Sequence, residues 1–345
     1  MTTKDISAEV ANSYIVSEPE TNYLIDATRK SDGSLLATSY VDVVWQTASG
    51  FVQYADFEDG KASFYIGADS DDATKIKQGN AVIGAYNADD ELIWSWHIWA
   101  TDYDPDAEGG TVVFNDYTLM NRNLGAQAND NSTTDKILAS YGLYYQWGRK
   151  DPYRNMAAGS INERPEINPA WKTVTGNTVY WNDWNIQNAW SSWEKRNNYP
   201  LCFMYSRTYY DGRDYNWVKY ETAPTHYLWF TPKTNFDPCP AGYRIPTQQE
   251  FDVDYTLDDD GNIGFTVVAD RQFNPLPAQG YLKFDGTPRF IGQEVTLWTC
   301  QPYATGAGQL GAYNFDYYIG EPSSLTNTDL VNRSFAMPVR CVKIK

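Results

Sequence analysis

The four cysteines of this chain are the residues whose chemistry is easiest to anticipate, because pairs of thiols can join as disulfides. An even number allows three complete pairings, and free buried thiols are the alternative. Cys239 lies between Pro238 and Pro240, which restrict the backbone, and its plausible mate Cys341 lies near the C-terminal end. A bridge between them would close a loop of about 100 residues and stabilise the fold by about 4–5 kcal/mol in the chain-entropy model.

Catalytic and metal-binding chemistry has few candidate residues. The two histidines, His97 and His226, leave little for a zinc site or a catalytic triad, and we expect His97 to be structural. Among 44 acidic residues no motif marks a catalytic carboxylate pair. The acidic runs Asp102–Gly110 and Asp258–Gly261 lack EF-hand spacing. We therefore expect no catalytic residue and no cofactor, with structural calcium as an unsupported alternative.

Ligand binding has a better candidate in the stretch Gln301–Ser334, which is rich in Tyr, Asn, Ser, Thr and Gly. Rigid aromatic rings interleaved with small polar residues are typical of binding loops, although an ordinary glycine-rich surface loop has a similar composition. The predicted ligand-binding residues in and just before this loop are Trp298, Tyr303, Tyr313, Asn314, Phe315, Asp316, Tyr317, Tyr318, Asn327 and Arg333.

The elements before this stretch begin with a series of strands. A spacing of roughly ten residues between them predicts a β-sandwich. In the last strand both alternating faces carry bulky residues, so we expect both to be covered, one of them by a second domain. The expected strands are Ser13–Val16, Tyr23–Ala27, Tyr40–Gln46, Phe51–Ala55, Ala62–Ile66, Ala81–Tyr86 and Leu92–Thr101.

The second domain is expected to follow a linker at Asp102–Gly110, which gives boundaries of 1–108 and 109–345. Tyr141–Pro152 shows apolar positions at helical spacing. Thr247 with Glu250 forms a capping box, so a second helix should begin at about Gln248. The fold class predicted is an all-β sandwich followed by an α+β domain. Between these helices, Asn155–Pro238 is irregular and tryptophan-rich, and its rings are expected to form a small core or a sugar-stacking platform.

Charge and hydropathy limit the partners. The net charge of −17 argues against nucleic acid and anionic membranes, which are approached through basic patches. No apolar run approaches the roughly 20 residues of a membrane-spanning helix. The start at Met1–Lys4 shows no signal peptide, which leaves two alternatives: a cytoplasmic protein, or the mature form of an exported one.

Several segments together resemble a known family, and they occur in its order. These are Met120–Ala126 (MNRNLGA), Tyr141–Pro152, Asp237–Thr247, Trp298-Thr299 and Val339–Lys343. Over about Tyr117–Lys345 the chain resembles the Fibrobacter succinogenes major paralogous domain, a C-type-lectin-like module of exported proteins of gut anaerobes. Ala11–Ser17 and Asn80–Asp102 resemble the β-sandwich that precedes it in fimbrillin-like surface proteins.

The resemblance implies that the two terminal strands of the lectin-like domain meet and that Cys239 and Cys341 take the stapling positions. The segment after Trp298 takes the position of the binding loop, and its composition is similar to the variable region of retroelement-diversified surface proteins. Cys300 departs from the pattern and is a candidate to pair with Cys202. The calcium motif of sugar-binding animal lectins is absent, so the resemblance implies no calcium-dependent sugar binding.

Three functions follow from these expectations. The first is an exported cell-surface adhesin, pilus-tip-like, that binds a glycan or protein ligand on another cell. The second is a structural pilus or envelope subunit that contacts other subunits through its sandwich. The third is an enzyme, because formylglycine-generating enzymes have a related fold and reactive cysteines, whereas Cys239 and Cys341 are expected to be structural here.

Overall fold

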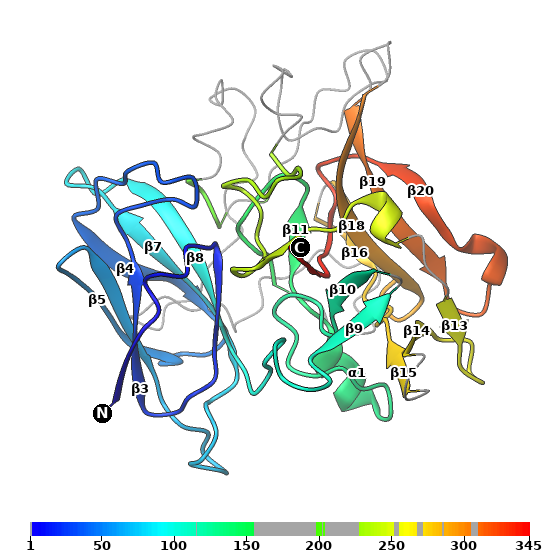
Figure 1. Ribbon diagram of the computed structural model, residues 1–345, viewed down its shortest axis with the longest axis horizontal. Helices are drawn as coiled ribbons and strands as arrows, with labels where there is room; N and C mark the ends of the chain where they lie inside the picture. Colours follow the sequence, from blue (N-terminus) through cyan, green and yellow to red (C-terminus); the bar gives the residue numbers. More distant parts are fainter. Residues whose placement is uncertain are drawn as a thin grey trace.

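The computed structural model describes residues 2–114, 116–154, 198–201, 203, 228–251, 255–267, 272–284, 286–304 and 310–345. Within these residues the protein is mostly β, with six sheets and one α-helix, α1 (Thr134–Ser140) (Figure 1). None of the helices in this part of the chain has the length and apolar character needed to cross a membrane. The β-rich part of the predicted fold class is therefore confirmed.

The N-terminal hundred residues form two four-stranded sheets that enclose one apolar core, which we call the N-terminal sandwich (Figure 1). The first sheet has the order β1 (Thr2–Asp5), β3 (Thr21–Asp26), β6 (Lys61–Ile66) and β5 (Val52–Glu58). The second has the order β2 (Ser13–Val16), β8 (Leu92–Ala100), β7 (Gly79–Tyr86) and β4 (Tyr40–Gln46).

Each strand predicted for this region is present within a few residues of its expected bounds. In β3 the side chains alternate between buried and half-buried positions, as a strand with one face in a core requires. One strand was missed: β1 is fully exposed and pairs parallel to β3 at the sheet edge. Its polar sequence carries no alternation that could have revealed it.

Both faces of β8 are covered, as predicted. Trp96 and Ile98 point into the sandwich core, whereas Trp99 packs into a second core that it shares with the C-terminal half of the chain. Strict alternation from Trp96 would place Leu92 on the side of the sandwich core and Ile93 on the opposite side. Instead, Ile93 packs against the sandwich core and Leu92 against the second core, because the β7–β8 register shifts between Ala85 and Tyr86.

The described residues of the C-terminal half form four smaller sheets (Figure 1). Two are four-stranded: β12 (Tyr243–Arg244), β22 (Val342–Lys343), β10 (Tyr117–Met120) and β9 (Thr111–Phe114); and β11 (Tyr144–Gln146), β21 (Ala336–Pro338), β16 (Tyr281–Leu282) and β17 (Pro288–Arg289). Two are three-stranded: β13 (Tyr255–Leu257), β14 (Ile263–Val267) and β15 (Gln272–Pro275); and β18 (Glu294–Ala304), β19 (Leu310–Tyr318) and β20 (Thr326–Val331). The described part of this half also has two short 3₁₀ helices, η2 (Gln248–Phe251) and η3 (Pro322–Ser324).

The helix predicted at Tyr141–Pro152 is wrong. This segment contains strand β11, and the α-helix precedes it at α1. The residues from Tyr141 to Tyr153 are buried throughout, so their apolar spacing reflects coverage from every side and not one face of a helix. The second predicted helix begins where expected, but its described part is the single 3₁₀ turn η2.

The N-terminal sandwich and the C-terminal half meet in a polar joint that is closed to solvent. Lys150 Nζ donates to Asp151 Oδ1 at 2.8 Å, and Ser95 Oγ of β8 donates to the same oxygen at 2.6 Å. Burial lowers the pKa of Lys150, and the charge of Asp151 opposes that shift. The ammonium also lies 4.5 Å from the centre of the Trp94 ring. Each charge in the joint therefore has a partner, as buried ions require.

His97 is the second element of this joint, and it is structural as predicted. Its Nδ1 lies 3.0 Å from Ser13 Oγ and its Nε2 lies 2.9 Å from Asn80 Oδ1. The amide Nδ2 of Asn80 donates to Gly125 O at 3.0 Å, which orients Oδ1 toward the imidazole. The ring is thus satisfied in its neutral form, and burial lowers its pKa to about 3.

The buried His97 makes a prediction about pH. Because its pKa is about 3 in the fold and about 6.5 in the unfolded chain, the unfolded state takes up the proton first as the pH falls. The stability that neutral His97 contributes is therefore complete above pH 6.5 and is lost between that pH and about 3, at up to about 1.4 kcal/mol per pH unit.

Urea unfolding at a series of pH values would measure this loss in the wild type and in His97→Gln. Other groups titrate in both proteins, so the difference between their unfolding free energies isolates His97. A difference that stays constant as the pH falls from about 7 to about 4.5, through the unfolded-state pKa of His97, would contradict a neutral His97.

Candidate functional site

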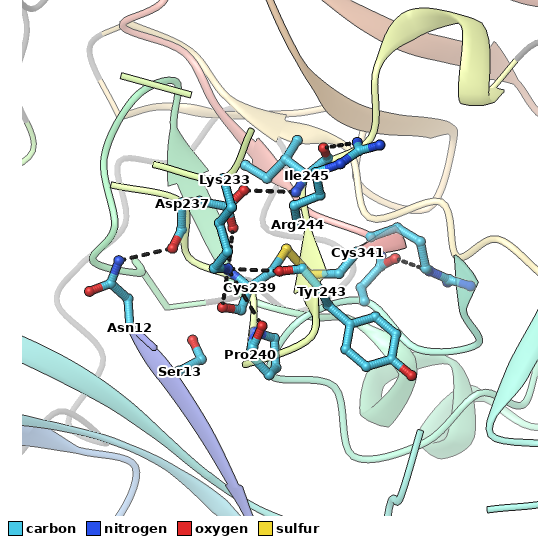
Figure 2. The surroundings of a disulfide bond; sticks show 12 residues. Asn12, Ser13, Lys233, Asp237, Cys239, Pro240, Tyr243, Arg244, Ile245 and Cys341 are labelled. Atoms are coloured by element: carbon cyan, nitrogen blue, oxygen red, sulfur yellow. Dashed lines mark hydrogen bonds and ion pairs between the residues drawn. A yellow bond between two sulfur atoms is a disulfide. The ribbon is translucent and has the colours of Figure 1, made fainter. Parts of the chain in front are cut away.

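The disulfide predicted between Cys239 and Cys341 is present and anchors the C-terminal half (Figure 2). The two Cα atoms lie 6.0 Å apart across a sequence separation of 102 residues, and both side chains are fully buried. Cys341 directly precedes β22, and β22 lies between β12 and β10. The bridge therefore fastens the proline-flanked segment to the strand that joins the two ends of this half.

Asp237 organises the backbone around that bridge (Figure 2). Its Oδ1 accepts from Cys239 N at 2.8 Å and from Lys233 Nζ at 2.9 Å, and its Oδ2 accepts from Ile245 N at 2.9 Å. Burial lowers the pKa of Lys233, and the Asp237 charge opposes the shift. The backbone carbonyl of Asp237 also accepts from Asn12 Nδ2 at 2.9 Å, so one residue joins the disulfide to the N-terminal sandwich.

The predicted capping box is confirmed in one of its two bonds. Glu250 Oε2 accepts from Thr247 N at 2.7 Å, but Glu250 N bonds to the Thr247 carbonyl and not to its hydroxyl. Both Nη atoms of Arg244 donate to the same carboxylate, at 2.8 and 2.6 Å. Burial by itself would raise the pKa of Glu250, but Arg244 and Thr247 outweigh it and lower the pKa.

The stretch predicted as a binding loop is mostly strand, so the expectation that it is a loop is wrong. β18 and β19 form an antiparallel hairpin, and β20 pairs with β19. Successive side chains along each strand therefore point to opposite faces of this sheet. Val295, Leu297, Phe315 and Tyr317 point into an apolar core. On the opposite face the buried residues are Glu294, Thr296, Trp298, Asn314 and Asp316.

The predicted ligand-binding residues therefore fall into two groups. Buried side chains, which a ligand in solution does not reach, belong to Trp298, Asn314, Phe315, Asp316, Tyr317 and Arg333. Half-buried ones belong to Tyr303, Tyr313 and Tyr318, and Asn327 lies in β20 with its side chain outside the described part.

The buried members of this set have structural partners. Trp298 Nε1 donates to Tyr145 O at 2.7 Å, and Tyr317 OH donates to Gly261 O at 2.9 Å. Arg333 Nε donates to Gly311 O at 2.9 Å, and its guanidinium lies 4.4 Å from the centre of the Trp147 ring. These contacts hold the hairpin to the rest of the C-terminal half.

A set of five half-buried rings lies beside the polar face of this hairpin, and we call it the aromatic row. Its neighbouring ring centres are 6.3, 5.3, 6.0 and 5.4 Å apart. The two closest rings are nearly parallel, at 11°, and the last pair is edge to face. In spatial order the row is Phe284, Phe335, Tyr281, Phe290 and Tyr318.

Two features distinguish the row from an ordinary apolar surface. Phe290 has a φ of 52°, a left-handed conformation that is a genuine outlier for a bulky residue. Its carbonyl accepts from the N–H groups of Gln293 and Glu294, which hold it there. At the end of the row, burial raises the pKa of Tyr318, and the charge and hydrogen bond of Glu294 raise it further.

Sequence reasoning identified Tyr318 alone among these five rings. Tyr281 belongs to the two-residue strand β16, and Phe284 follows two residues after it. Phe290 directly follows β17, and Phe335 directly precedes β21. No pattern in the sequence marks these rings as neighbours, because they come from separate segments of the chain. Tyr303 and Tyr313 form a separate edge-to-face pair at 5.7 Å, across the register shift in the β18–β19 hairpin.

The other expectations for sulfur and tryptophan are resolved in part. Cys300 is a free, buried thiol, so it does not form the bridge expected between it and Cys202, which lies outside the described residues. Burial raises the pKa of Cys300 to about 12, which keeps it protonated. Trp229 is fully buried against Trp147 at 5.8 Å. The expectations for Trp171, Trp181, Trp184, Trp190, Trp193 and Trp217 lie outside the described residues.

In the described part of the chain, no three His, Cys, Asp or Glu side chains come together as a metal site would require. Asp258 accepts from the N–H groups of Asp260 and Asn262, so the Asp258–Gly261 run is the predicted hairpin turn. The linker at Asp102–Gly110 is likewise a series of turns, closed by Tyr103 OH donating to Gly110 O at 2.6 Å.

No protein family, curated protein or solved structure matches this chain. The candidate site is therefore described by its geometry alone. It consists of the disulfide-anchored C-terminal half, the buried polar face of the hairpin, and the aromatic row of half-buried rings beside that face.

The bridge makes a prediction about stability. Replacing both Cys239 and Cys341 by serine should lower the free energy of unfolding by about 4–5 kcal/mol, because the loop that the bridge closes spans 102 residues. Urea unfolding with and without reductant measures this. Reductant should lower the stability of the wild type and of Cys300→Ser, and leave the double variant unchanged. Equal wild-type curves in both conditions would contradict the prediction.

Proposed function

We propose that this protein is a non-enzymatic cell-surface adhesin whose C-terminal half binds a glycan or protein ligand on another cell. The aromatic row is the observation that supports this proposal. Rigid rings near the centre of a surface carry much of the binding energy in known interfaces, because they bury a large area at little cost in side-chain entropy. The net charge of −17 favours such partners over nucleic acid.

The backbone at Phe290 supports a functional reading of the row. A left-handed conformation at a residue with a side chain costs about 1–3 kcal/mol, and such strain tends to persist where it serves binding or catalysis. Glycine would adopt φ 52° without that cost. Keeping phenylalanine at this turn places its ring between Tyr281 and Tyr318 and so completes the row.

The proposed fold assignment for residues 109–345 is a C-type-lectin-like domain similar to the Fibrobacter succinogenes major paralogous domain, preceded by a fimbrillin-like β-sandwich over 1–108. Two observations support it. Leu119 of β10 pairs with Val342 of β22, so the strands near both ends of this half meet. Cys239 and Cys341 are joined where the resemblance places its staple.

Export to the cell surface is part of the proposal. Disulfides persist in oxidising compartments and are rare in the cytosol of most organisms, so the Cys239–Cys341 bridge is compatible with an exported protein. An adhesin also needs a head that keeps its shape outside the cell, which the bridge favours.

The row is tested by Phe290→Gly, which removes one ring and relieves the backbone strain. We expect binding to a ligand found by glycan-array or surface-protein screening to weaken by about 30-fold or more, as for a residue at the centre of an interface. The free energy of unfolding should change by less than about 1 kcal/mol, because lost ring contacts and relieved strain oppose each other.

Tyr54→Ala is the control, because Tyr54 is an exposed ring stacked on Tyr65 in the N-terminal sandwich, away from the row. Tyr303→Ala and Tyr313→Ala test the other end of the hairpin. Full binding by Phe290→Gly, with loss in the Tyr303 and Tyr313 variants, would move the site to that end.

A structural pilus or envelope subunit is the second candidate, and β1 is the observation that favours it. Every residue of β1 is exposed, and it occupies the sheet edge parallel to β3. Two exposed ion pairs, Lys4 with Glu18 and Lys61 with Asp5, help to hold it, and exposed pairs contribute little stability. A weakly held edge strand can leave and admit a strand from another chain.

Locking β1 tests that candidate. Thr3 pairs with Asn22, and neighbouring strands lie about 5 Å apart, so the double substitution Thr3→Cys with Asn22→Cys should form a bridge. If subunits join by strand exchange, light scattering will show assemblies for the wild type and for the reduced variant, but not for the oxidised variant. Monomers in all three samples would count against this function.

A further inference from the structure

A groove lies where the N-terminal sandwich meets the segment Asn198–Leu201. Its volume is about 520 Å³, within the range of pockets that enclose drug-sized ligands. Tyr86 and Leu92 line it from the sandwich, and Tyr199 and Leu201 line it from the other side. Both halves of the chain therefore contribute to it.

The floor of the groove is built on a glycine. A Cβ on Gly84 would clash with Leu92 Cδ1, and it would lie 2.8 Å from Val44 Cγ2 and 3.1 Å from Tyr86 Cε2. These three side chains, which line the groove, pack down onto the bare backbone of β7. The opposite wall is anchored, because the buried Arg149 donates through Nη2 to Tyr199 O at 2.8 Å.

The rim carries negative charge. Asp90 and Glu91, in the β7–β8 turn, both line the groove and are exposed. Asp90 Oδ1 accepts from Tyr40 OH at 3.2 Å, and Glu91 Oε2 accepts from Asn87 Nδ2 at 3.1 Å. Each carboxylate has its second oxygen clear of hydrogen bonds to the described residues. No lysine or arginine is among the described lining residues.

We propose that this groove binds an arginine or lysine side chain presented by a partner protein. The aliphatic stem of such a side chain fits the apolar floor, and its charged end reaches the rim carboxylates. The tyrosine rings add a favourable surface for a cation. Charge complementarity selects this occupant: the lining carries two carboxylates, which repel an anion and attract a cation, whereas a neutral sugar gains nothing from their charge.

A protein segment fits the groove better than a free small cation. The volume exceeds what one side chain needs, and the open rim leaves room for the flanking residues of an extended peptide. This site is separate from the aromatic row, so it adds a second contact surface and does not depend on the function proposed for the row.

The test is a titration of the protein with the peptide acetyl-Leu-Arg-Leu-amide, in which binding is measured by calorimetry and by NMR. The uncharged isostere, with citrulline in place of arginine, is the comparison peptide. We expect the arginine peptide to bind and the citrulline peptide not to bind. The affinity for the arginine peptide should fall by about tenfold or more when the salt concentration rises from about 0.05 to about 0.5 M. The double variant Asp90→Asn with Glu91→Gln should weaken it by a similar factor.

Both substitutions suit their positions. Asp90 has a φ of 59°, which asparagine tolerates, and glutamine can still accept from Asn87. The control is Glu58→Gln with Asp71→Asn, which changes the net charge equally at exposed sites outside the groove and should bind like the wild type. Equal binding of the two peptides, retained affinity in the double variant, or a neutral oligosaccharide that displaces the arginine peptide would each overturn the proposal.

Discussion

A single buried carboxylate, that of Asp237, connects the parts of this molecule that lie far apart in sequence. Its two oxygens satisfy the backbone N–H groups on either side of the Cys239 turn and pair with Lys233. The backbone carbonyl oxygen of Asp237 accepts a hydrogen bond from Asn12 Nδ2 of the N-terminal sandwich. A buried charge is tolerated only while each partner is in place, so the turn, the disulfide and the joint depend on one another. This mutual dependence explains why a short proline-flanked segment can fix the position of a whole sheet.

The joint extends this principle from a turn to the whole interface. Lys150, Asp151 and Ser95 form a closed ionic cluster, and His97 with Asn80 continues it through neutral hydrogen bonds. Around these polar groups, one apolar core draws side chains from both halves, among them Trp99 and Trp147. An interface that combines a shared core with satisfied buried polar groups is rigid and specific in its geometry. Surfaces on either half are therefore presented in a fixed relation.

The sequence was most informative where one physical pattern determined the structure. The strands of the N-terminal sandwich could be predicted because short runs of β-branched and aromatic residues recur there at a spacing of roughly ten residues. It was least informative where composition alone guided the interpretation. Tyrosine occurs both in cores and on surfaces, so Tyr317 and Phe315 resembled loop residues although they are buried in strand β19. The aromatic row could not be predicted, because its rings come from segments that only the finished fold brings together.

The position of β8 has a mechanical consequence. This strand leads into the connection to the C-terminal half, and it is hydrogen-bonded to β7 on one side and to the parallel β2 on the other. Tension applied at the two ends of the chain would, once the interface between the halves has opened, pull β8 along its own axis. The bonds on both flanks would then be loaded together in shear, and none could open one at a time from an end. Such an arrangement resists sudden extension far better than a peeled hairpin of the same length.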